Sequence, residues 1–190
     1  MARIGLIDVD GGKNFPNIAL MKISAYHKSI GDEVEWYSPF DGWFNKVYMS
    51  KVFSFTPDYD EWINADEVIK GGTGYAISLV DGKEIFDKRK DANLPAEIEG
   101  MYPDYSLYPA LTQDTAYGFL TRGCPRGCDF CIVGKKEGRC SVKVADLNQF
   151  WGGAEKHSAV RPKYLGLQGM EKPLAAADRQ QGEGRLQSRP

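Results

Sequence analysis

Three closely spaced cysteines constrain this chain more than any other feature of its sequence. Cys124, Cys128 and Cys131 follow a C-x-x-x-C-x-x-C spacing on a loop that also carries glycine and proline. The loop comes directly after a strand-like run at residues 116–121. Thiolates held this close together typically bind a metal ion or an iron–sulfur cluster. We therefore expect a metal centre at the end of a strand.

Length, composition and the first residues indicate the kind of protein and the cellular compartment in which these thiols are found. The 190 residues suffice for one ordinary domain, or for a small domain and part of another. The sequence begins with a short apolar run and acidic residues rather than a signal peptide, so we expect a cytoplasmic protein, where reduced thiols favour metal chemistry over disulfides. The net charge is −2, and no apolar run approaches the ~20 residues of a membrane span. We expect neither nucleic acid nor a membrane among its partners.

The first residues have the pattern of a β-loop-α-β unit. An apolar, β-branched run at 3–9 predicts a buried parallel strand. Asn17 is placed to cap a helix over 18–29, which Gly31 would end. The helix is expected to bury one face, formed by Ile18, Met21, Ala25 and Ile30. A second strand is predicted at 33–37.

Further strands extend this unit into an open α/β sheet. Strands are predicted at 46–53 and 67–70, and a short helix at 58–63. The glycine-rich stretch at 71–75 lacks the Gly-Lys-Ser/Thr of a phosphate-binding loop, so we expect a sharp turn there. Asp81-Gly82 predicts a two-residue hairpin turn between two short strands. In sheets of this kind, ligand sites form at the carboxyl ends of the strands.

The cysteine loop resembles the cluster loop of the radical S-adenosylmethionine (radical SAM) enzymes. The likeness rests on the cysteine spacing, on Phe130 before the third cysteine and on the strand before the loop. It implies that Cys124, Cys128 and Cys131 ligate three irons of a [4Fe–4S] cluster whose fourth iron binds S-adenosylmethionine, with Phe130 near the adenine. It also implies an external electron donor such as a flavodoxin or ferredoxin, and a 5′-deoxyadenosyl radical that abstracts hydrogen from a substrate the sequence does not identify.

Cys140 decides the class of site. As a fourth ligand it would close the site into a four-cysteine zinc or electron-transfer iron–sulfur module. As an ordinary residue at the start of the next strand it would leave the cluster open. A first gap of three residues is less usual for zinc than a gap of two, and an aromatic residue before the third cysteine is typical of radical SAM proteins. We favour the open cluster; an α/β protein whose cysteines bind no metal is a third hypothesis.

Basic residues surround the loop. They either offset the charge of an anionic cluster and of the cofactor carboxylate, or simply face solvent. The residues are Arg122, Arg126, Lys135 and Lys136.

The first half of the chain resembles the cobalamin-binding, Rossmann-like domain that precedes the catalytic barrel in many radical SAM proteins. The likeness lies in the alternation of strands and helix. The D-x-H-x-x-G signature, whose histidine binds cobalt, is absent, because His27 has no aspartate two residues before it. We expect His27 at a helix surface or boundary, and no bound cobalamin.

The sequence thus predicts an α/β protein of four parts. A small, open, parallel Rossmann-like sheet occupies 1–86. An ordered, proline-punctuated linker without helix spans 87–114, and its tyrosines are expected to pack the junction. The first strand and cluster loop of an incomplete (β/α) barrel occupy 115–151. Residues 152–190 lack a periodic apolar pattern and are expected to be disordered.

The change of character after Trp151 suggests a shifted reading frame. A barrel of this type takes ~200 residues or more, and few follow the cysteine loop. With suitable synonymous codons, a shift of one nucleotide after Trp151 allows the new frame to read as a strand-like run followed by an amphipathic helix. We expect the chain to be frameshifted or truncated there and to lack turnover, which the nucleotide sequence of the gene would test.

Overall fold

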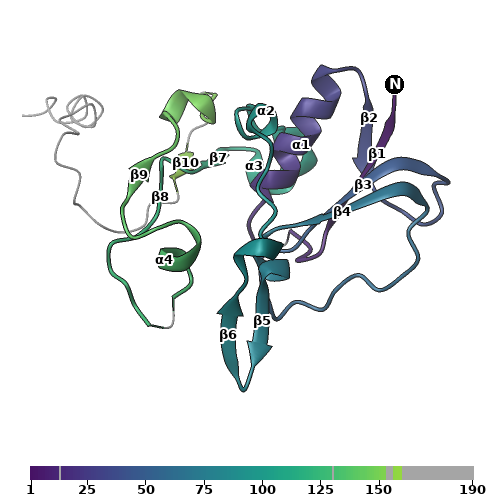
Figure 1. Cartoon of the computed structure of the whole chain (residues 1–190). Coiled ribbons are helices and arrows are strands. Elements are labelled where there is room, and N and C mark those ends of the chain that lie inside the picture. The colour runs from purple at the N-terminus through teal and green to yellow at the C-terminus, as the bar shows by residue number, and fades with distance from the viewer. Residues whose placement is uncertain (13, 130, 153–155, 160–190) are drawn as a thin grey trace, which may run out of the picture.

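A computed structural model describes residues 1–12, 14–129, 131–152 and 156–159 and shows an α/β fold (Figure 1). Four parallel strands form one sheet in the order β2-β1-β3-β4. They are β1 (Arg3–Asp8), β2 (Glu33–Trp36), β3 (Phe44–Ser50) and β4 (Ala65–Gly71). All four predicted strands are confirmed, although β3 begins and ends earlier than the predicted 46–53. Among the described helices, none has the length and apolar character needed to cross a bilayer.

Helix α1 (Ile18–Ser29) has the predicted bounds, because both of its ends are capped as the sequence indicates. The side-chain oxygen of Asn17 accepts a hydrogen bond from the Leu20 N–H at 3.2 Å. After the last turn, Gly31 takes a φ of +87°, and the Asp32 N–H donates to the His27 carbonyl at 2.9 Å. Glycine favours this helix ending because it adopts positive φ without strain.

The face that α1 buries differs from the predicted one. Of the predicted face only Met21 is buried, and Ile30 is 57% exposed. The buried side consists of Leu20, Met21, Ile23, Ser24 and His27. Positions 20, 23, 24 and 27 have the i, i+3, i+4, i+7 spacing of one helix face. Two of these residues, Ser24 and His27, are polar, so apolar periodicity alone misses the stripe.

Apolar side chains fill both faces of the sheet. On the side of α1, one buried cluster is formed by Ile4, Leu6, Leu20, Ile23 and Ile98. On the opposite face, a second cluster is formed by Ile7, Phe44, Val47 and Met49. Tyr59 and Ile63 pack against this second cluster as coil, so the short helix predicted at 58–63 is wrong. Asp58 is held instead by the Tyr75 hydroxyl at 2.5 Å, which ties this segment to the turn after β4.

A turn and a hairpin follow β4, as predicted. A 3₁₀ turn, η1 (Thr73–Ala76), leads into β5 (Ile77–Val80), which pairs antiparallel with β6 (Lys83–Phe86). Asp81 and Gly82 have φ values of 50° and 73°, the left-handed pair that an Asp-Gly hairpin turn requires. The hairpin projects from the rest of the molecule in Figure 1.

Short helices interrupt the segment 87–114, where none was predicted. They are η2 (Lys88–Lys90), α2 (Ala96–Glu99), η3 (Tyr105–Leu107) and α3 (Pro109–Thr112). Ile98 is 5% exposed, and Leu94 and Leu107 pack against the same cluster beside α1. The segment therefore contributes to the core of the N-terminal sheet as well as connecting that sheet to the cysteine-bearing part of the chain.

The remaining residues form a second group of short elements. They are β7 (Thr115–Gly118), β8 (Thr121–Arg122), α4 (Val133–Lys136), β9 (Val142–Lys143), η4 (Leu147–Gln149) and β10 (Lys156–Ala159). The single strand predicted at 116–121 is divided between β7 and β8. Gly118 leaves room for the Phe150 ring against β7, since a Cβ there would overlap the ring.

One part of the predicted tail is ordered. Residues 156–159 form β10, which pairs parallel with β7, so the prediction of disorder is wrong for these four residues. The pairing register joins His157 to Ala116. Residues 153–155 and 160–190 lie outside the described residues.

Candidate metal centre

Two short strands carry the cysteine loop. β8 pairs antiparallel with β9, with Arg122 opposite Val142, and the loop runs between them. At the start of the loop Gly123 is buried and has a φ of +85°. A Cβ at this position would overlap the carbonyl oxygen of Cys140, so only glycine lets the two ends of the loop approach this closely.

Polar contacts close the stem of the loop. The Glu137 carboxylate accepts a hydrogen bond from the Arg122 guanidinium at 3.0 Å and another from the Gly123 N–H at 3.0 Å. The Cys124 N–H donates to the Gly138 carbonyl at 3.1 Å. The main chain entering the first cysteine is therefore fixed to the main chain leaving the loop.

The three predicted ligands lie within this closed loop. Cys124, Cys128 and Cys131 are all half-buried and none is in a disulfide. Gly127 takes a φ of 62°, and the Cys131 N–H donates to the Cys128 carbonyl at 3.1 Å, so the second and third cysteines share one turn. Cys140 is exposed. Phe130, the predicted neighbour of the adenine, lies outside the described residues.

The described side chains show no preformed site for a single metal ion. Within that part of the chain, no three His, Cys, Asp or Glu side chains gather closely enough to hold one. A cubane cluster makes a different demand, since each thiolate binds its own iron and the ligands need not converge on one point. Three half-buried thiols on a single loop fit the donor set of such a cluster.

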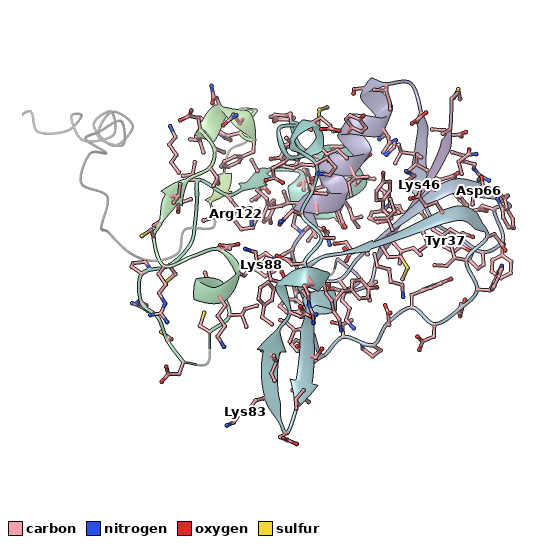
Figure 2. The ribbon with its side chains drawn as sticks, in the orientation of Figure 1. Tyr37, Lys46, Asp66, Lys83, Lys88 and Arg122 are labelled. Atoms are coloured by element: carbon pink, nitrogen blue, oxygen red, sulfur yellow. The ribbon has the colours of Figure 1, made fainter. Side chains whose placement is uncertain are left out.

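Among the predicted basic residues, Arg122 and Lys136 form ion pairs with other described residues. Arg122 pairs with Glu137, and its guanidinium also lies 3.8 Å from Glu99 of α2. In Figure 2, Arg122 lies on the side of the cysteine-bearing part that faces the N-terminal part of the chain. Lys136 pairs with Asp91 at 3.0 Å and donates to the Thr73 hydroxyl at 2.5 Å. These contacts hold the loop against the 87–114 segment and the turn after β4.

The sequence did not identify Glu137, Asp91 or Thr73 as part of this region. Glu137 directly follows α4, and its partners Arg122 and Gly123 lie 15 and 14 residues earlier in the chain. Asp91 and Thr73 are 45 and 63 residues from Lys136, and no local pattern connects them.

The carboxyl end of β1, where the sequence predicted ligand sites to form, is occupied by the protein itself. The Tyr108 hydroxyl donates to Asp8 at 2.6 Å, and the Tyr108 ring fills the space that a Cβ on Gly12 would need. Burial raises the pKa of Asp8, and the hydrogen bond from Tyr108 opposes the shift. Burial and the neighbouring Asp8 also raise the pKa of Tyr108. Segment 87–114 therefore covers this edge of the sheet.

Neither His27 nor the glycine-rich turn at 71–75 offers a free ligand group. His27 is buried rather than at the helix surface, and its ring nitrogens contact Asp32 at 2.9 Å and the Tyr48 hydroxyl at 3.0 Å. The glycine-rich turn packs around Lys51: Gly72 has a φ of +99°, and a Cβ on it would overlap the Lys51 carbonyl. These glycines serve a close main-chain approach, as the predicted sharp turn requires.

Comparison with known proteins gives no relative for this chain. No protein-family model matches it, and no match was found among curated proteins or solved structures.

Proposed function

We propose that this chain is a radical SAM iron–sulfur protein in which Cys124, Cys128 and Cys131 bind three irons of a [4Fe–4S] cluster. One observation carries the proposal: three half-buried thiols lie on a single loop, in the C-x-x-x-C-x-x-C spacing, between paired strands β8 and β9. Three thiolates leave one iron of the cube without a protein ligand. S-adenosylmethionine would bind at that open iron.

When bound and reduced, such a cluster would supply one electron to S-adenosylmethionine, and breaking a carbon–sulfur bond would then release methionine and a 5′-deoxyadenosyl radical for hydrogen abstraction. The residues of the chain would ligate the cluster and shield it, with Phe130 beside the adenine. The electron would come from an external donor of the flavodoxin or ferredoxin kind. We propose a cytoplasmic protein, because reducing surroundings keep the thiols available for iron.

We propose that the N-terminal sheet binds no cobalamin. Both ring nitrogens of His27 are engaged within the protein, and Tyr108 fills space at the carboxyl end of β1. The sheet would then serve to support the cysteine loop, through Asp91 and Thr73.

Anaerobic reconstitution with iron and sulfide tests the proposal. The wild-type chain should bind about four irons, and its reduced electron paramagnetic resonance spectrum should change when S-adenosylmethionine is added. Cys128→Ser should lose the cluster. A colourless protein, or a spectrum that ignores S-adenosylmethionine, would exclude a radical SAM centre.

A second candidate is a closed four-cysteine site for zinc or an electron-transfer cluster. The close approach of Gly123 to the Cys140 carbonyl favours it, because this brings the main chain of Cys140 beside that of Cys124. Cys140→Ala distinguishes the two candidates. Metal content should survive in the open cluster and collapse in the closed site, whereas Cys128→Ala should abolish it in both.

A further inference from the structure

The carboxylate of Glu137 joins the two ends of the cysteine loop. One oxygen accepts from the Arg122 guanidinium and the other from the Gly123 N–H, each at 3.0 Å. Arg122 ends β8 and Gly123 directly precedes Cys124, whereas Glu137 directly follows α4. All three proposed ligands therefore lie within the stretch of chain that this carboxylate closes.

The surroundings make these contacts stronger than an exposed ion pair. The side chains of Glu137 and Arg122 are 22% and 34% exposed, and Gly123 is buried. Hydrogen bonds to an ionised carboxylate are roughly twice as strong as neutral ones. A buried N–H that loses its acceptor is left without water to replace it. The Gly123 amide therefore depends on Glu137.

We propose that Glu137 is a positioning residue that closes the cysteine loop before any metal binds and fixes the main chain at Cys124. A loop that is already closed loses less conformational entropy when its thiols take up a cluster. The proposal rests on the proposed function for the identity of the metal. The closure itself is a property of the metal-free chain.

Amide hydrogen exchange on the metal-free 190-residue chain tests the closure of the loop. Glu137→Ala should raise the exchange rate of the Gly123 amide by about tenfold or more, while amides of β1 and β3 keep their protection. Glu137→Gln should restore part of the protection, because its amide oxygen still accepts from Gly123. Glu99→Ala is the matched control, since Glu99 also lies near Arg122, at 3.8 Å, whereas the Gly123 N–H donates to Glu137.

Iron content after anaerobic reconstitution tests whether the closed loop binds the cluster more readily. Glu137→Ala should bind less iron per chain than wild type, Glu137→Gln an intermediate amount, and Glu99→Ala the wild-type amount. Unchanged exchange at Gly123 in Glu137→Ala, or an equal effect of Glu99→Ala, would overturn the proposal. If the wild type binds no iron, the proposed function fails, and the exchange data still decide whether Glu137 closes the loop.

Discussion

Replacing Lys136 with methionine should weaken the attachment of the cysteine loop to the N-terminal part of the protein. The Lys136 ammonium lies 3.0 Å from Asp91 and 2.5 Å from the Thr73 hydroxyl. The side chains of Lys136 and Asp91 are 17% and 8% exposed. Methionine keeps much of the volume of lysine but leaves the Asp91 carboxylate without a cation and with little water.

The structure sets the size of the expected loss. Removing one partner of a fully buried ion pair typically costs about 3–5 kcal/mol. Lys136 retains some contact with water, so we expect about 2–3 kcal/mol, below the fully buried case. In a protein of this size that corresponds to a fall in Tm of about 5–10 °C, or to a fall in the urea midpoint of about 1 M.

Thermal and urea unfolding, followed by circular dichroism, measure this loss. Lys135→Met is the matched control, because Lys135 is exposed and makes no ion pair with any described residue. The double variant Lys136→Met/Asp91→Asn should recover part of the stability, since it removes both charges. A Lys136→Met protein within about 0.5 kcal/mol of wild type, or one no less stable than Lys135→Met, would refute the reasoning.

Single contacts elsewhere in the chain give three further predictions. Gly123→Ala should lower the free energy of unfolding by at least about 2 kcal/mol in urea titrations, and it should also reduce iron uptake. Gly138→Ala is its control, because φ is also positive there but the space is open, and its free energy of unfolding should fall by only about 1 kcal/mol. Asn17→Ala removes the cap of α1 and should cost about 1 kcal/mol in the same assay, and an unchanged midpoint would contradict this. Burial raises the pKa of Asp8 above its usual 3.8, so the folded chain holds this proton more tightly than the unfolded chain. The contribution of Asp8 to wild-type stability should therefore fall as the pH rises above 3.8, and Asp8→Asn should remove that part of the pH dependence; equal pH slopes would contradict it.

The local elements of the N-terminal sheet could be predicted because their signals are local. Asn17 and Gly31 mark the ends of α1, and Asp81-Gly82 marks the hairpin. The buried face of α1 could not be predicted in this way. Each of its polar members has a partner far away in the sequence. Ser24 donates to Asp104 at 2.6 Å, 80 positions later in the chain, and the His27 ring contacts the Tyr48 hydroxyl, 21 positions later.

The cysteine loop shows the same difference between features with a local sequence signal and contacts that depend on the tertiary fold. The spacing of the three cysteines marks the loop in the sequence, and Gly123 and Gly127 supply its bends with their positive φ angles. The engagement of Lys136 was not foreseen, because its acceptors are brought together only by the tertiary fold. The role of Phe130 stays a prediction, since that residue lies outside the described part of the chain.

The part of the protein that carries the cysteines has little apolar core of its own. Both buried clusters belong to the N-terminal sheet, and among the described residues from 115 onward the buried apolar side chains are Ala116 and Phe150. Polar contacts hold this part in place, including those of Lys136 and of the Tyr105 hydroxyl, which donates to the Tyr117 carbonyl at 3.2 Å. A unit with so small a core gains stability from whatever binds and cross-links its loop. Metal binding and attachment to the N-terminal sheet should therefore reinforce each other.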